Sequence, residues 1–436
     1  MGALVTELAR AVAAAGGRAY EVGGTVRDRL LGRTAKDEDL EVYGLSPGAL
    51  EAVIARFGTV RRVGARLGVY VLRGVEVALP QGPGGVEDPH LTPEQAARRR
   101  DLTINALLRD PLSGEILDFH GGRADLQRGV LRPVAAATFV EDPLRLLRVV
   151  RLHAGLGFRI HPTTAALCRG LSLQGVAWER IGQELAAWLV RAPSPERGLD
   201  ALLYTGAERQ FPALYALRGC PVGPGWAAGA DAWSLTRAVL AAAGARRTGE
   251  RERDWPLMLA ALLQAVGRPG VTRHCGGAWR APGAAGAAAA RVLPWLHRVD
   301  RSQVVARPVR ALVAEQASID ALAATGAGAP AYRRLAARVD SDLLLRLAEA
   351  LHAARHGDRA PYAAAERART RWLAEDLLGR APTPLLQGRD VQALGVAPGP
   401  AIGRWLEAAF QAQLDGAFTP PRPGAAAAIA APPPQW

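Results

Sequence analysis

The apolar residues in the first third of the chain recur with two periods, one typical of helices and one typical of strands. Helical spacing, with apolar residues three and four positions apart, covers residues 4–15, 26–31 and 47–57. Apolar and polar residues alternate over 19–22 and 39–43, and residues 60–79 form a meander of short strands separated by glycines. This mixture predicts an α+β head over residues 1–136, with a small β-sheet and helices.

Beyond the head, the apolar positions repeat with the helical period and are interrupted by breaks rich in glycine and proline. This pattern predicts an all-α remainder, with a neck over 137–205, a body over 206–365 and a tail over 366–418. The final residues, 419–436, are rich in proline and alanine, and we expect them to be disordered.

The charge of the chain points to an acidic partner. Its 436 residues are enough for two to four domains, and they carry a formal net charge of +13. Nucleic acid is the partner class that such a positive excess fits best. The alternative is a solubility device in an arginine-rich proteome, because Lys36 is the only lysine. We therefore base the prediction on the sign of the charge and not on the choice of arginine over lysine.

Cysteine usage and hydropathy bear on the compartment. The three cysteines are far apart and odd in number, so no disulfide framework or CxxC metal site is predicted. This usage fits a reducing cytoplasm. The longest apolar runs, such as 255–266, are too short to cross a bilayer, and no secretion signal is recognisable. We expect a soluble cytoplasmic protein without membrane contact.

A phosphate-binding loop is predicted near the N-terminus. Gly23 and Gly24 lack a Cβ, so their backbone N–H groups can approach a phosphate closely. The helical stretch that follows directs its N-terminus at the same anion. Arg27 adds a fixed positive charge.

Acidic residues on the next predicted strand indicate a metal site. Alternation places Asp37, Asp39 and Glu41 on one face and leaves the apolar residues between them for the core. Two carboxylates two positions apart can share hard cations, and Mg²⁺ suits a site that combines carboxylates with substrate phosphates. Glu76 becomes a third carboxylate if its strand lies beside this one, and an exposed glutamate without a chemical role is the alternative. The chemistry implied is phosphoryl or nucleotidyl transfer with two metals.

An arginine stripe is predicted on a helix of the neck. Arg145, Arg148 and Arg151 recur at every third position and therefore share one side of the helix. A solvated basic face is the simpler interpretation. Because the stripe directly follows Glu141 and Asp142, we favour a face directed at nucleotide phosphates.

Several longer motifs occur in one order along the chain. The chain resembles the bacterial tRNA nucleotidyltransferases, which are the CCA-adding family, and their relatives the bacterial poly(A) polymerases. The resemblance covers about residues 18–185, and its motifs are long enough to be specific. The motifs are GGTVRD at 23–28, DED at 37–39, RRRDLTINA at 98–106, EDPLR at 141–145 and ERIGQEL at 179–185.

The resemblance implies transfer of nucleotides from CTP and ATP to the 3′-hydroxyl of tRNA, with release of pyrophosphate. Gly23, Gly24 and Arg27 would hold the triphosphate, and Asp28 would support that loop. Two Mg²⁺ ions would be held by Asp37 and Asp39. Glu76 would assist them in catalysis.

The same resemblance assigns sugar recognition. Asp101 would accept a hydrogen bond from the 2′-hydroxyl of the nucleotide, the group that separates ribonucleotides from deoxynucleotides. Arg100 and Asn105 would support it.

Base selection follows from Asp142 and Arg145, which are three positions apart, so that one helix would present both to the edge of a base. Cytosine and adenine offer an amino donor beside a ring acceptor, whereas guanine and uracil show the reverse order. An acceptor and donor pair therefore admits C and A without a nucleic-acid template, and Glu141 would orient Arg145. The alternative is an ordinary helix start with a capping acid.

Three competing functions remain. A bacterial poly(A) polymerase shares the head, but residues 63–70 look like the VGxxFG segment of the tRNA enzymes. A tRNA-binding pseudoenzyme is the non-enzymatic alternative, and retention of the acidic residues argues against it. Addition of only two C residues is the third, because the connection over 80–90 looks shorter than the flexible loop of full CCA-adding relatives and has Gln81 at the position of an arginine.

The body resembles a degenerate hydrolase domain. Relatives of this size often carry a metal-dependent phosphohydrolase there, recognised by a histidine and a His-Asp pair, and residues 231–234 and 263–267 lack these ligands. His352, His356 and Asp358 could chelate a metal, with two surface histidines as the stronger interpretation.

The segment 386–403 resembles the C-terminal part of longer bacterial members. Its Gly-Pro turn opens a helix, whose free N–H groups could bind an RNA phosphate. An ordinary turn and helix cap is the alternative.

Overall fold

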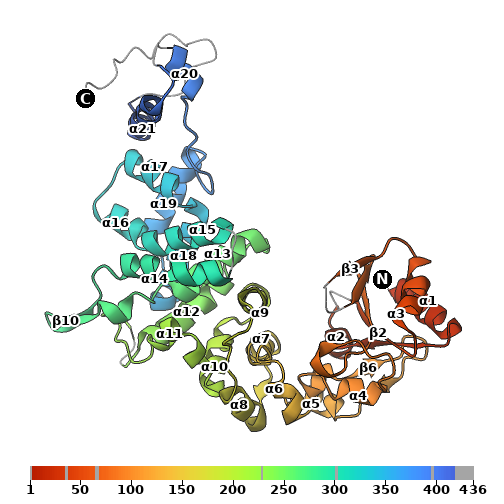
Figure 1. Ribbon diagram of the computed structural model, residues 1–436. Coiled ribbons are helices and arrows are strands. Elements are labelled where there is room, and N and C mark those ends of the chain that lie inside the picture. The colour runs from red at the N-terminus through yellow and green to blue at the C-terminus, as the bar shows by residue number, and fades with distance from the viewer. Residues whose placement is uncertain are drawn as a thin grey trace. The chain divides into compact units, whose positions relative to one another are not determined.

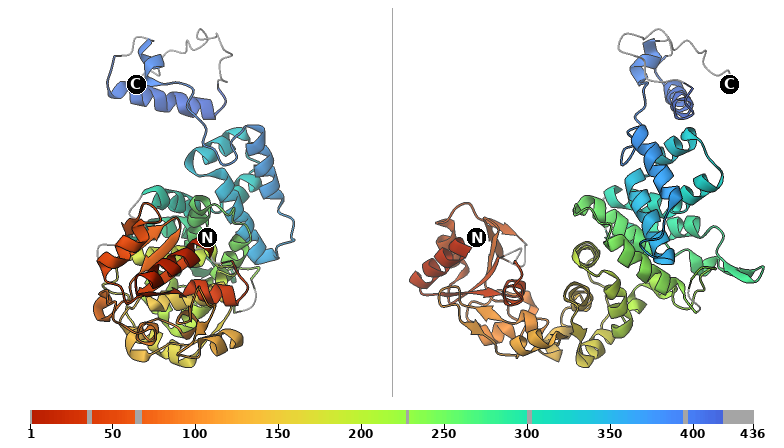
Figure 2. Two further views of the ribbon diagram at one scale, coloured as in Figure 1. Left: turned by 90° about the vertical axis from the view of Figure 1, so that its right-hand side faces the viewer. Right: turned by 180° about the vertical axis from the view of Figure 1, so that it is seen from behind.

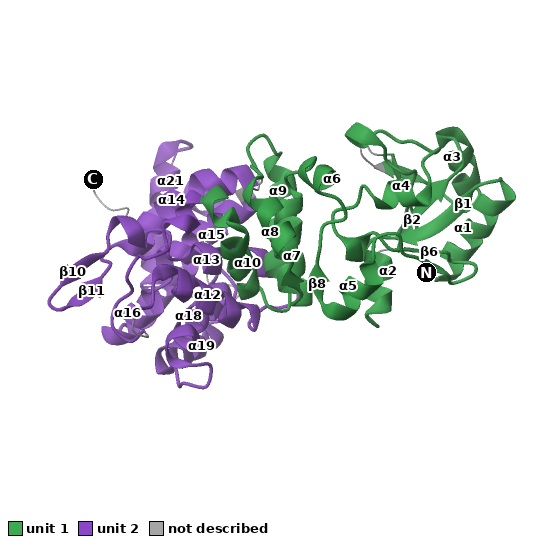
Figure 3. Cartoon of the chain, turned by 90° about the horizontal axis from the view of Figure 1, so that it is seen from below, with its two compact units in different colours: residues 1–211 green, residues 212–436 purple. Residues whose placement is uncertain are grey.

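The computed structural model describes residues 2–34, 38–63, 68–226, 229–299, 303–393 and 397–417. The chain divides into two compact units, residues 1–211 and 212–436 (Figure 3). The predicted head and neck both fall within unit 1. The finer domain boundaries stay a prediction, and the proposed disorder of 419–436 lies outside the described residues.

Unit 1 contains a seven-stranded sheet with the order β3-β4-β5-β2-β1-β6-β7. β2 pairs in parallel with β5 on one side and antiparallel with β1 on the other, so it lies in the interior of the sheet. The strands are β1 (Arg18–Val22), β2 (Glu38–Tyr43), β3 (Arg61–Val63), β4 (Val69–Leu72), β5 (Val75–Ala78), β6 (Leu108–Arg109) and β7 (Ile116–Leu117).

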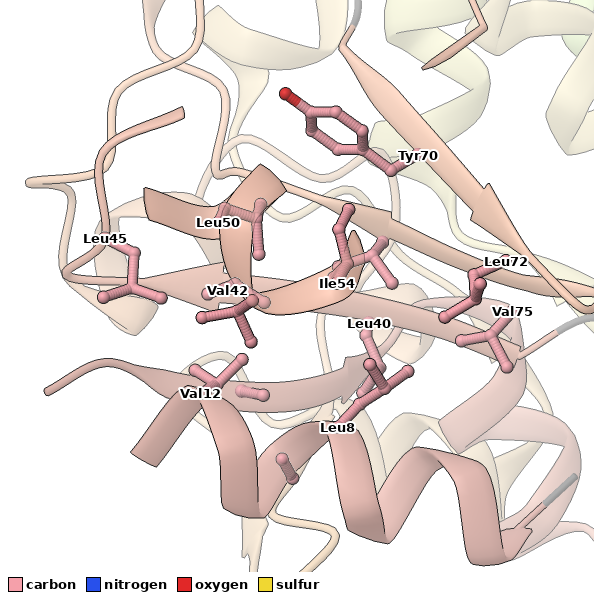
Figure 4. Packing of buried hydrophobic residues seen from close by; sticks show 14 of the residues in the cluster. Leu8, Val12, Leu40, Val42, Leu45, Leu50, Ile54, Tyr70, Leu72 and Val75 are labelled. Atoms are coloured by element: carbon pink, nitrogen blue, oxygen red, sulfur yellow. The ribbon is translucent and has the colours of Figure 1, made fainter. Parts of the chain in front are cut away.

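Helices α1 (Gly2–Ala14) and α3 (Pro47–Ala55) supply the apolar cover of one face of this sheet (Figure 4). Leu8 of α1 packs in one cluster with Leu40 and Val42 of β2, and all three are almost fully buried. Burial of each such side chain contributes about 1.5–3 kcal/mol. Because β2 alternates, Asp39 and Glu41 lie on its other face, as predicted.

The opposite face carries the polar residues of interest. Tyr20, Val22 and Tyr43 form a smaller cluster there with alanines of α4 (Pro93–Ala97). α4 begins with a capping box, in which Thr92 and Gln95 each accept a hydrogen bond from the backbone N–H of the other. The Arg98–Ala106 motif follows directly after this short helix.

The rest of unit 1 is mainly helical. A two-stranded parallel sheet of β8 (Val130–Leu131) and β9 (Arg159–Ile160) joins the end of the head to the neck. Between β5 and α4 the chain forms the 3₁₀ turn η1 (Pro83–Gly85), and η2 (Thr103–Asn105) follows α4. The helices are α2 (Gly24–Leu30), α5 (Gly122–Arg128), α6 (Ala136–Val140), α7 (Arg145–Leu156), α8 (Pro162–Arg169), α9 (Trp178–Arg191) and α10 (Glu196–Thr205), followed by η3 (Ala207–Gln210).

Unit 2 consists of packed helices and one hairpin (Figure 1, Figure 2). The hairpin joins β10 (Arg273–Cys275) to β11 (Ala278–Arg280) and follows the 3₁₀ turn η4 (Arg268–Gly270). The helices are α11 (Pro212–Tyr215), α12 (Ala232–Gly244), α13 (Arg251–Leu263), α14 (Ala284–Val299), α15 (Gln303–Glu315), α16 (Ser318–Ala324), α17 (Ala329–Arg338), α18 (Ser341–His356), α19 (Ala363–Ala374), α20 (Gly388–Ala393) and α21 (Pro400–Leu414).

The predicted α+β head followed by helical segments is confirmed, with two departures. Strand β9 in the neck and the β10–β11 hairpin in the body add strands to regions that we expected to be entirely helical. Both involve strands of only two or three residues, too short to give an alternating pattern. Within the described part of the chain, no helix has the length and apolar character needed to span a membrane.

Candidate functional site

The glycine loop lies between β1 and α2. Gly23 has φ 67° and ψ −131°, a left-handed backbone that any larger residue would adopt only with strain. A Cβ on Gly24 would lie 3.4 Å from Nη2 of Arg27, tighter than most such contacts. The loop therefore brings backbone and guanidinium close together, and the first N–H groups of α2 have no partner within the helix.

Arg27 is held at both ends of its guanidinium. Its Nε donates to Oδ1 of Asp28 at 2.8 Å, and its Nη1 donates to Oδ1 of Asn105 at 2.8 Å. The residue is 9% exposed. Asn105 in turn donates from Nδ2 to Oδ1 of Asp101 at 3.0 Å. A continuous hydrogen-bonded chain thus connects the glycine loop to the Arg98–Ala106 motif.

Asp101 is the buried charge at the end of that chain. Its Oδ1 also accepts from the Leu102 N–H at 2.8 Å, and Nε of Arg148 lies 3.0 Å from Oδ2, without the alignment of a hydrogen bond. Burial by itself would raise the pKa of the Asp101 carboxyl, but Arg148, Asn105 and the Leu102 N–H outweigh it and lower that pKa. Asp101 is therefore an ionised acceptor at neutral pH.

A second charge pair fixes the residue before it. Arg100 donates from Nη2 to Oε1 of Glu41 at 2.8 Å, and the Tyr43 hydroxyl donates to Oε2 of the same carboxylate. Glu41 raises the pKa of Arg100, and burial together with Glu41 raises the pKa of Tyr43. A Cβ on Gly23 would lie 3.7 Å from Nη1 of Arg100, so this guanidinium stands beside the glycine loop.

Of the two strand carboxylates predicted to hold metal, Asp39 is among the described residues. Asp37 lies outside the described residues. Asp39 is half-buried, its N–H donates to Oγ1 of Thr25 at 3.3 Å, and it is paired in register with Glu76 on the parallel neighbour β5. Paired positions on neighbouring strands share a face of the sheet. The exposed Glu76 therefore stands on the same side as Asp39, the condition under which we predicted a third carboxylate.

Arg27, Asp28 and Asp39 border a cleft of about 440 Å³ within unit 1. One side is formed by α2 and β2, and the other by α7 and α9. Arg151 on α7 lines it, held by an ion pair of 2.7 Å from its Nε to Oε2 of Glu184 on α9. Residues that line the cleft include Gly24, Thr25, Arg27, Asp28, Arg33, Asp39, Arg151 and Arg191.

The oxygen donors present suit a hard divalent cation. Asp39 and Glu76 are carboxylates, the ligand class that Mg²⁺ prefers. Among the described residues, no group of three histidine, cysteine or acidic side chains is close enough to hold a metal by itself. A site formed by protein carboxylates together with substrate phosphates fits this donor set better than an all-protein cage.

The predicted base-reading pair differs from expectation in its placement. Arg145 is the first residue of α7, whereas Asp142 precedes the helix, so the prediction that one helix carries both is wrong. Asp142 accepts from the Leu144 N–H at 3.2 Å and from Nη2 of Arg180 at 2.8 Å. Pro143 explains the late start, because a proline disfavours helical backbone at the residue before it.

Arg145 contacts backbone and not carboxylate. Its Nη1 donates to the Thr138 carbonyl, and its Nη2 donates to the Arg99 carbonyl at 2.6 Å. Burial lowers its pKa. Glu141 forms an ion pair of 2.7 Å with Nη2 of Arg99, and its role in orienting Arg145 stays a prediction. Arg99 therefore contacts both Glu141 and Arg145.

The arginine stripe on α7 is real, but its members have different internal partners. Arg145 binds backbone carbonyls, Arg148 faces Asp101 and Arg151 pairs with Glu184. The stripe is therefore not a plain solvated face, and its direction toward nucleotide phosphates stays a prediction.

Sequence reasoning missed several residues that hold the site. Glu41 and Tyr43 lie on the predicted polar face of β2, but nothing local to them indicates Arg100 as partner. Arg180 and Glu184 belong to the ERIGQEL motif and could have been selected from it. Asp125 is buried, accepts from Oγ1 of Thr103 at 2.8 Å and gave no recognisable signal.

In unit 2, the residues at the positions where a hydrolase would carry its metal ligands contact neighbouring residues of the fold. Asp231 is the N-cap of α12 and accepts from the Ser234 N–H at 2.9 Å. Gln264 is buried, with its Nε2 3.5 Å from Oγ1 of Thr236. His352 stacks on Tyr362 with ring centroids 4.2 Å apart, and Asp358 is bound by Arg246.

Replacing Arg148 with methionine should destabilise unit 1, because the change removes the cation that faces a buried carboxylate. The Arg148 side chain is 39% exposed, so solvent screens the pair and we expect a loss of about 2 kcal/mol at pH 7. The pKa of Asp101 is lowered when folded, so its stabilisation is present above the usual value of about 3.9 and is lost as the pH falls through the folded-state pKa.

Urea denaturation at a series of pH values measures this effect. The difference between wild type and Arg148→Met should shrink as the pH falls below about 3.9. The control is Arg123→Met, which removes an exposed arginine of α5. An Arg148→Met difference that does not change with pH would contradict the pairing.

The first half of the chain is similar in sequence to known proteins. Residues 19–132 match the family model described as the poly(A) polymerase head domain. The Multifunctional CCA protein of Pseudomonas paraeruginosa is 42% identical over 222 residues, which cover 46% of this chain and 52% of that protein. The protein of the same name from Halorhodospira halophila is 38% identical over 269 residues, covering 57% of this chain and 62% of that one. The chain thus spans about half the length of most of the curated relatives it matches.

Solved structures extend the likeness over both units. The CCA-adding enzyme of Bacillus stearothermophilus in complex with CTP has 26% identity and a TM-score of 0.66, covering 95% of this chain and 93% of that chain. The Thermotoga maritima CCA-adding enzyme complexed with tRNA shares the fold, with 20% identity and a TM-score of 0.58 over 96% of this chain and 92% of that one. The head match and the relatives agree with the ordered motifs, and the chain shares its fold with solved CCA-adding enzymes.

Proposed function

We propose that this protein is a tRNA nucleotidyltransferase that adds C, C and A from CTP and ATP to tRNA 3′ ends without a nucleic-acid template. The observation that carries the proposal is the hydrogen-bonded chain from Asp28 through Arg27 and Asn105 to Asp101, beside the cleft that Asp39 lines. This chain of hydrogen bonds connects the phosphate-binding loop to Asp101, the acceptor for the sugar. The strand carboxylate Asp39 lines the cleft beside it. Relatives named for CCA addition, and a similar structure solved with CTP, support this substrate choice.

The triphosphate binds at the start of α2. Backbone N–H groups of Gly23 and Gly24 approach its oxygens, and Arg27 supplies positive charge. Asp28 and Asn105 hold the Arg27 guanidinium before the substrate arrives, so little side-chain freedom is lost on binding.

The ribose is recognised by Asp101. Its Oδ1 is used by Leu102 and Asn105, whereas Arg148 is the cation facing Oδ2. A carboxylate oxygen accepts two hydrogen bonds, so Oδ2 can accept one from a 2′-hydroxyl. A deoxynucleotide lacks that donor. Arg100, fixed by Glu41, supports the same segment.

Two Mg²⁺ ions would be held by Asp37 and Asp39 together with substrate phosphates, and Glu76 would assist as the neighbouring carboxylate. Bound there, the metals would lower the pKa of the RNA 3′-hydroxyl and neutralise the charge of the leaving pyrophosphate. Arg27 and Arg151 orient the triphosphate from opposite sides of the cleft.

Base choice rests on Asp142 and Arg145. Asp142 offers an acceptor to the amino group of C or A, and Arg145 offers a donor to the ring nitrogen. Arg180 orients Asp142 through their ion pair, and the carbonyls of Thr138 and Arg99 hold the Arg145 guanidinium. Each correct pairing is worth about 1–3 kcal/mol of discrimination.

Addition of CC alone is the second candidate, and the segment 80–90 favours it. Gln81 and Glu87 form an antiparallel bridge, closed by hydrogen bonds from the Gly82 N–H to the Val86 carbonyl at 2.7 Å and from the Asp88 N–H to the Pro80 carbonyl at 2.8 Å. A segment closed on itself in this way lacks the freedom of the flexible loop that shifts the base pocket from C to A in the full CCA-adding relatives.

Substitution of Asp39 by alanine should abolish nucleotide addition, with at least a hundredfold loss in kcat, and leave tRNA binding nearly intact. The metals act on the chemical step, whereas arginine-rich surfaces supply the affinity. Incorporation of labelled CTP and a filter-binding assay measure the two effects separately. Asp37→Ala should have the same effect. The control is Glu115→Ala, which removes an exposed carboxylate. Near-normal turnover by Asp39→Ala would contradict its assignment as a metal ligand.

The double substitution of Asp142 and Arg145 by alanine should raise incorporation of G and U relative to C and A. The measured quantity is the ratio of kcat/KM values for the four nucleotides, which does not change with a general loss of active protein. A change of roughly five- to a hundredfold corresponds to the discrimination expected of one pair. Arg128→Ala, an exposed arginine of α5, is the control. An unchanged ratio would show that the two residues only start a helix.

The end of the product decides between the two candidates. A tRNA that ends at the discriminator base is supplied with CTP and ATP together, and the 3′ ends are sequenced. We expect products that end in CCA. Products that stall at CC with ATP present would contradict complete addition, and they would imply that a separate enzyme adds the final A.

A further inference from the structure

One long segment of unit 2 has no acidic residue. Between Asp254 and Asp300 the sequence contains neither aspartate nor glutamate, but it contains Arg268, Arg273, Arg280, Arg291 and Arg298. Here the positive charge accumulates without compensation along the sequence, and the β10–β11 hairpin lies within it.

The hairpin has a well-defined backbone. Gly276 and Gly277 have φ 57° and 77°, and two consecutive positive φ values form the turn whose twist matches paired antiparallel strands. At its base, the backbone packs closely against the chain, since a Cβ on Gly223 would lie 2.9 Å from the Trp279 carbonyl oxygen. The turn and this contact give it a fixed shape, although an isolated two-stranded hairpin is otherwise marginally stable.

The hairpin contributes nothing to a core. Arg273, His274 and Cys275 of β10 are exposed, as are Trp279 and Arg280 of β11. Figure 3 shows β10 and β11 extending away from the helices of unit 2. Trp279 alone is 42% exposed, a large apolar surface to leave in water. A shaped element without a packing role is suited to contact with a partner.

Register separates the side chains of the hairpin into two kinds. Arg273 is directly opposite Arg280, and His274 is directly opposite Trp279. The arginine pair therefore lies on one face and the aromatic pair on the other. Like charges directly opposite each other destabilise a hairpin, and among the described residues neither guanidinium has an ion-pair partner. An anion bound at the pair would relieve that repulsion.

The aromatic face offers a stacking surface. The rings of His274 and Trp279 meet edge to face, with centroids 5.2 Å apart and planes at 75°. This contact limits the freedom of the indole and leaves it partly exposed to solvent. A hairpin that carries arginines on one face and an exposed aromatic ring on the other offers RNA both phosphate-binding and base-stacking groups.

We propose that the β10–β11 hairpin is an RNA-contacting element, in which Arg273 and Arg280 bind a backbone phosphate and Trp279 stacks on an unpaired base. The identity of that RNA as tRNA rests on the proposed function, whereas the contact itself rests on the hairpin. The hairpin belongs to unit 2, whereas the residues proposed for catalysis belong to unit 1.

The test compares tRNA binding by full-length variants in the absence of nucleoside triphosphates. Arg273→Gln with Arg280→Gln should weaken binding about tenfold at moderate salt, and the slope of log K against log salt should fall by about one to two. Trp279→Ala should weaken binding about five- to tenfold or more, and Trp279→Phe should restore most of it because a ring remains. The matched control is Arg367→Gln, an exposed arginine of α19 in the same unit.

Heparin separates charge from stacking, because it carries negative charge but no bases. Trp279→Ala should bind heparin as wild type does, which also shows that the variant is folded. In the nucleotide-addition assay, the hairpin variants should raise the KM for tRNA and leave both kcat and the KM for CTP unchanged. Wild-type affinity for tRNA in both the double arginine variant and Trp279→Ala would overturn the inference.

The two proposals fail differently. If wild type adds no nucleotides but its RNA binding still depends on the hairpin, the proposed function is wrong and the contact stands. If nucleotide addition is normal in every hairpin variant at limiting tRNA, the contact is wrong and the proposed function stands.

Discussion

The buried carboxylate of Asp101 constrains much of unit 1. An ionised group this deeply buried needs a cation and hydrogen-bond donors, and it receives them from Arg148, Asn105 and the Leu102 N–H. These partners come from the head and from α7 of the neck. The contacts that stabilise this one charge therefore link the Arg98–Ala106 motif to α7, which forms the far side of the cleft. Through Asn105 and Arg27 they also link it to the glycine loop.

The same rule organises the other acids of the head. Glu21 is almost fully buried and bound by Arg29 and Arg109, and Glu41 is bound by Arg100. In these places arginine acts as an internal counter-ion, with a planar group that can meet several oxygens. The net charge of +13 therefore does not show where the unpaired positive charge lies. Paired arginines shape the cleft, whereas Arg273 and Arg280 of the hairpin are exposed to solvent.

In unit 2, the positions at which the family resemblance led us to look for hydrolase ligands have roles in local structure. At the positions where relatives often carry a hydrolase motif, Asp231 caps a helix and Gln264 is buried beside Thr236. Both are local structural tasks that require no metal. A helical scaffold of this kind can present a surface, and the described surface feature that stands out on it is the hairpin.

The sequence by itself determined the local features: the strand and helix periods of the head, the glycine loop, the alternation of β2 and the family motifs. Each depends on residues within a few positions of one another, so the pattern is visible along the chain. Only the tertiary structure decided the pairing of Arg27 with Asn105, 78 positions away, and of Arg100 with Glu41, 59 positions away. It also decided that Asp142 precedes its helix and binds Arg180. Charge pairing in three dimensions leaves no period in the sequence, because any arginine of an arginine-rich chain is an equally plausible partner until folding places one of them within reach of the buried carboxylate.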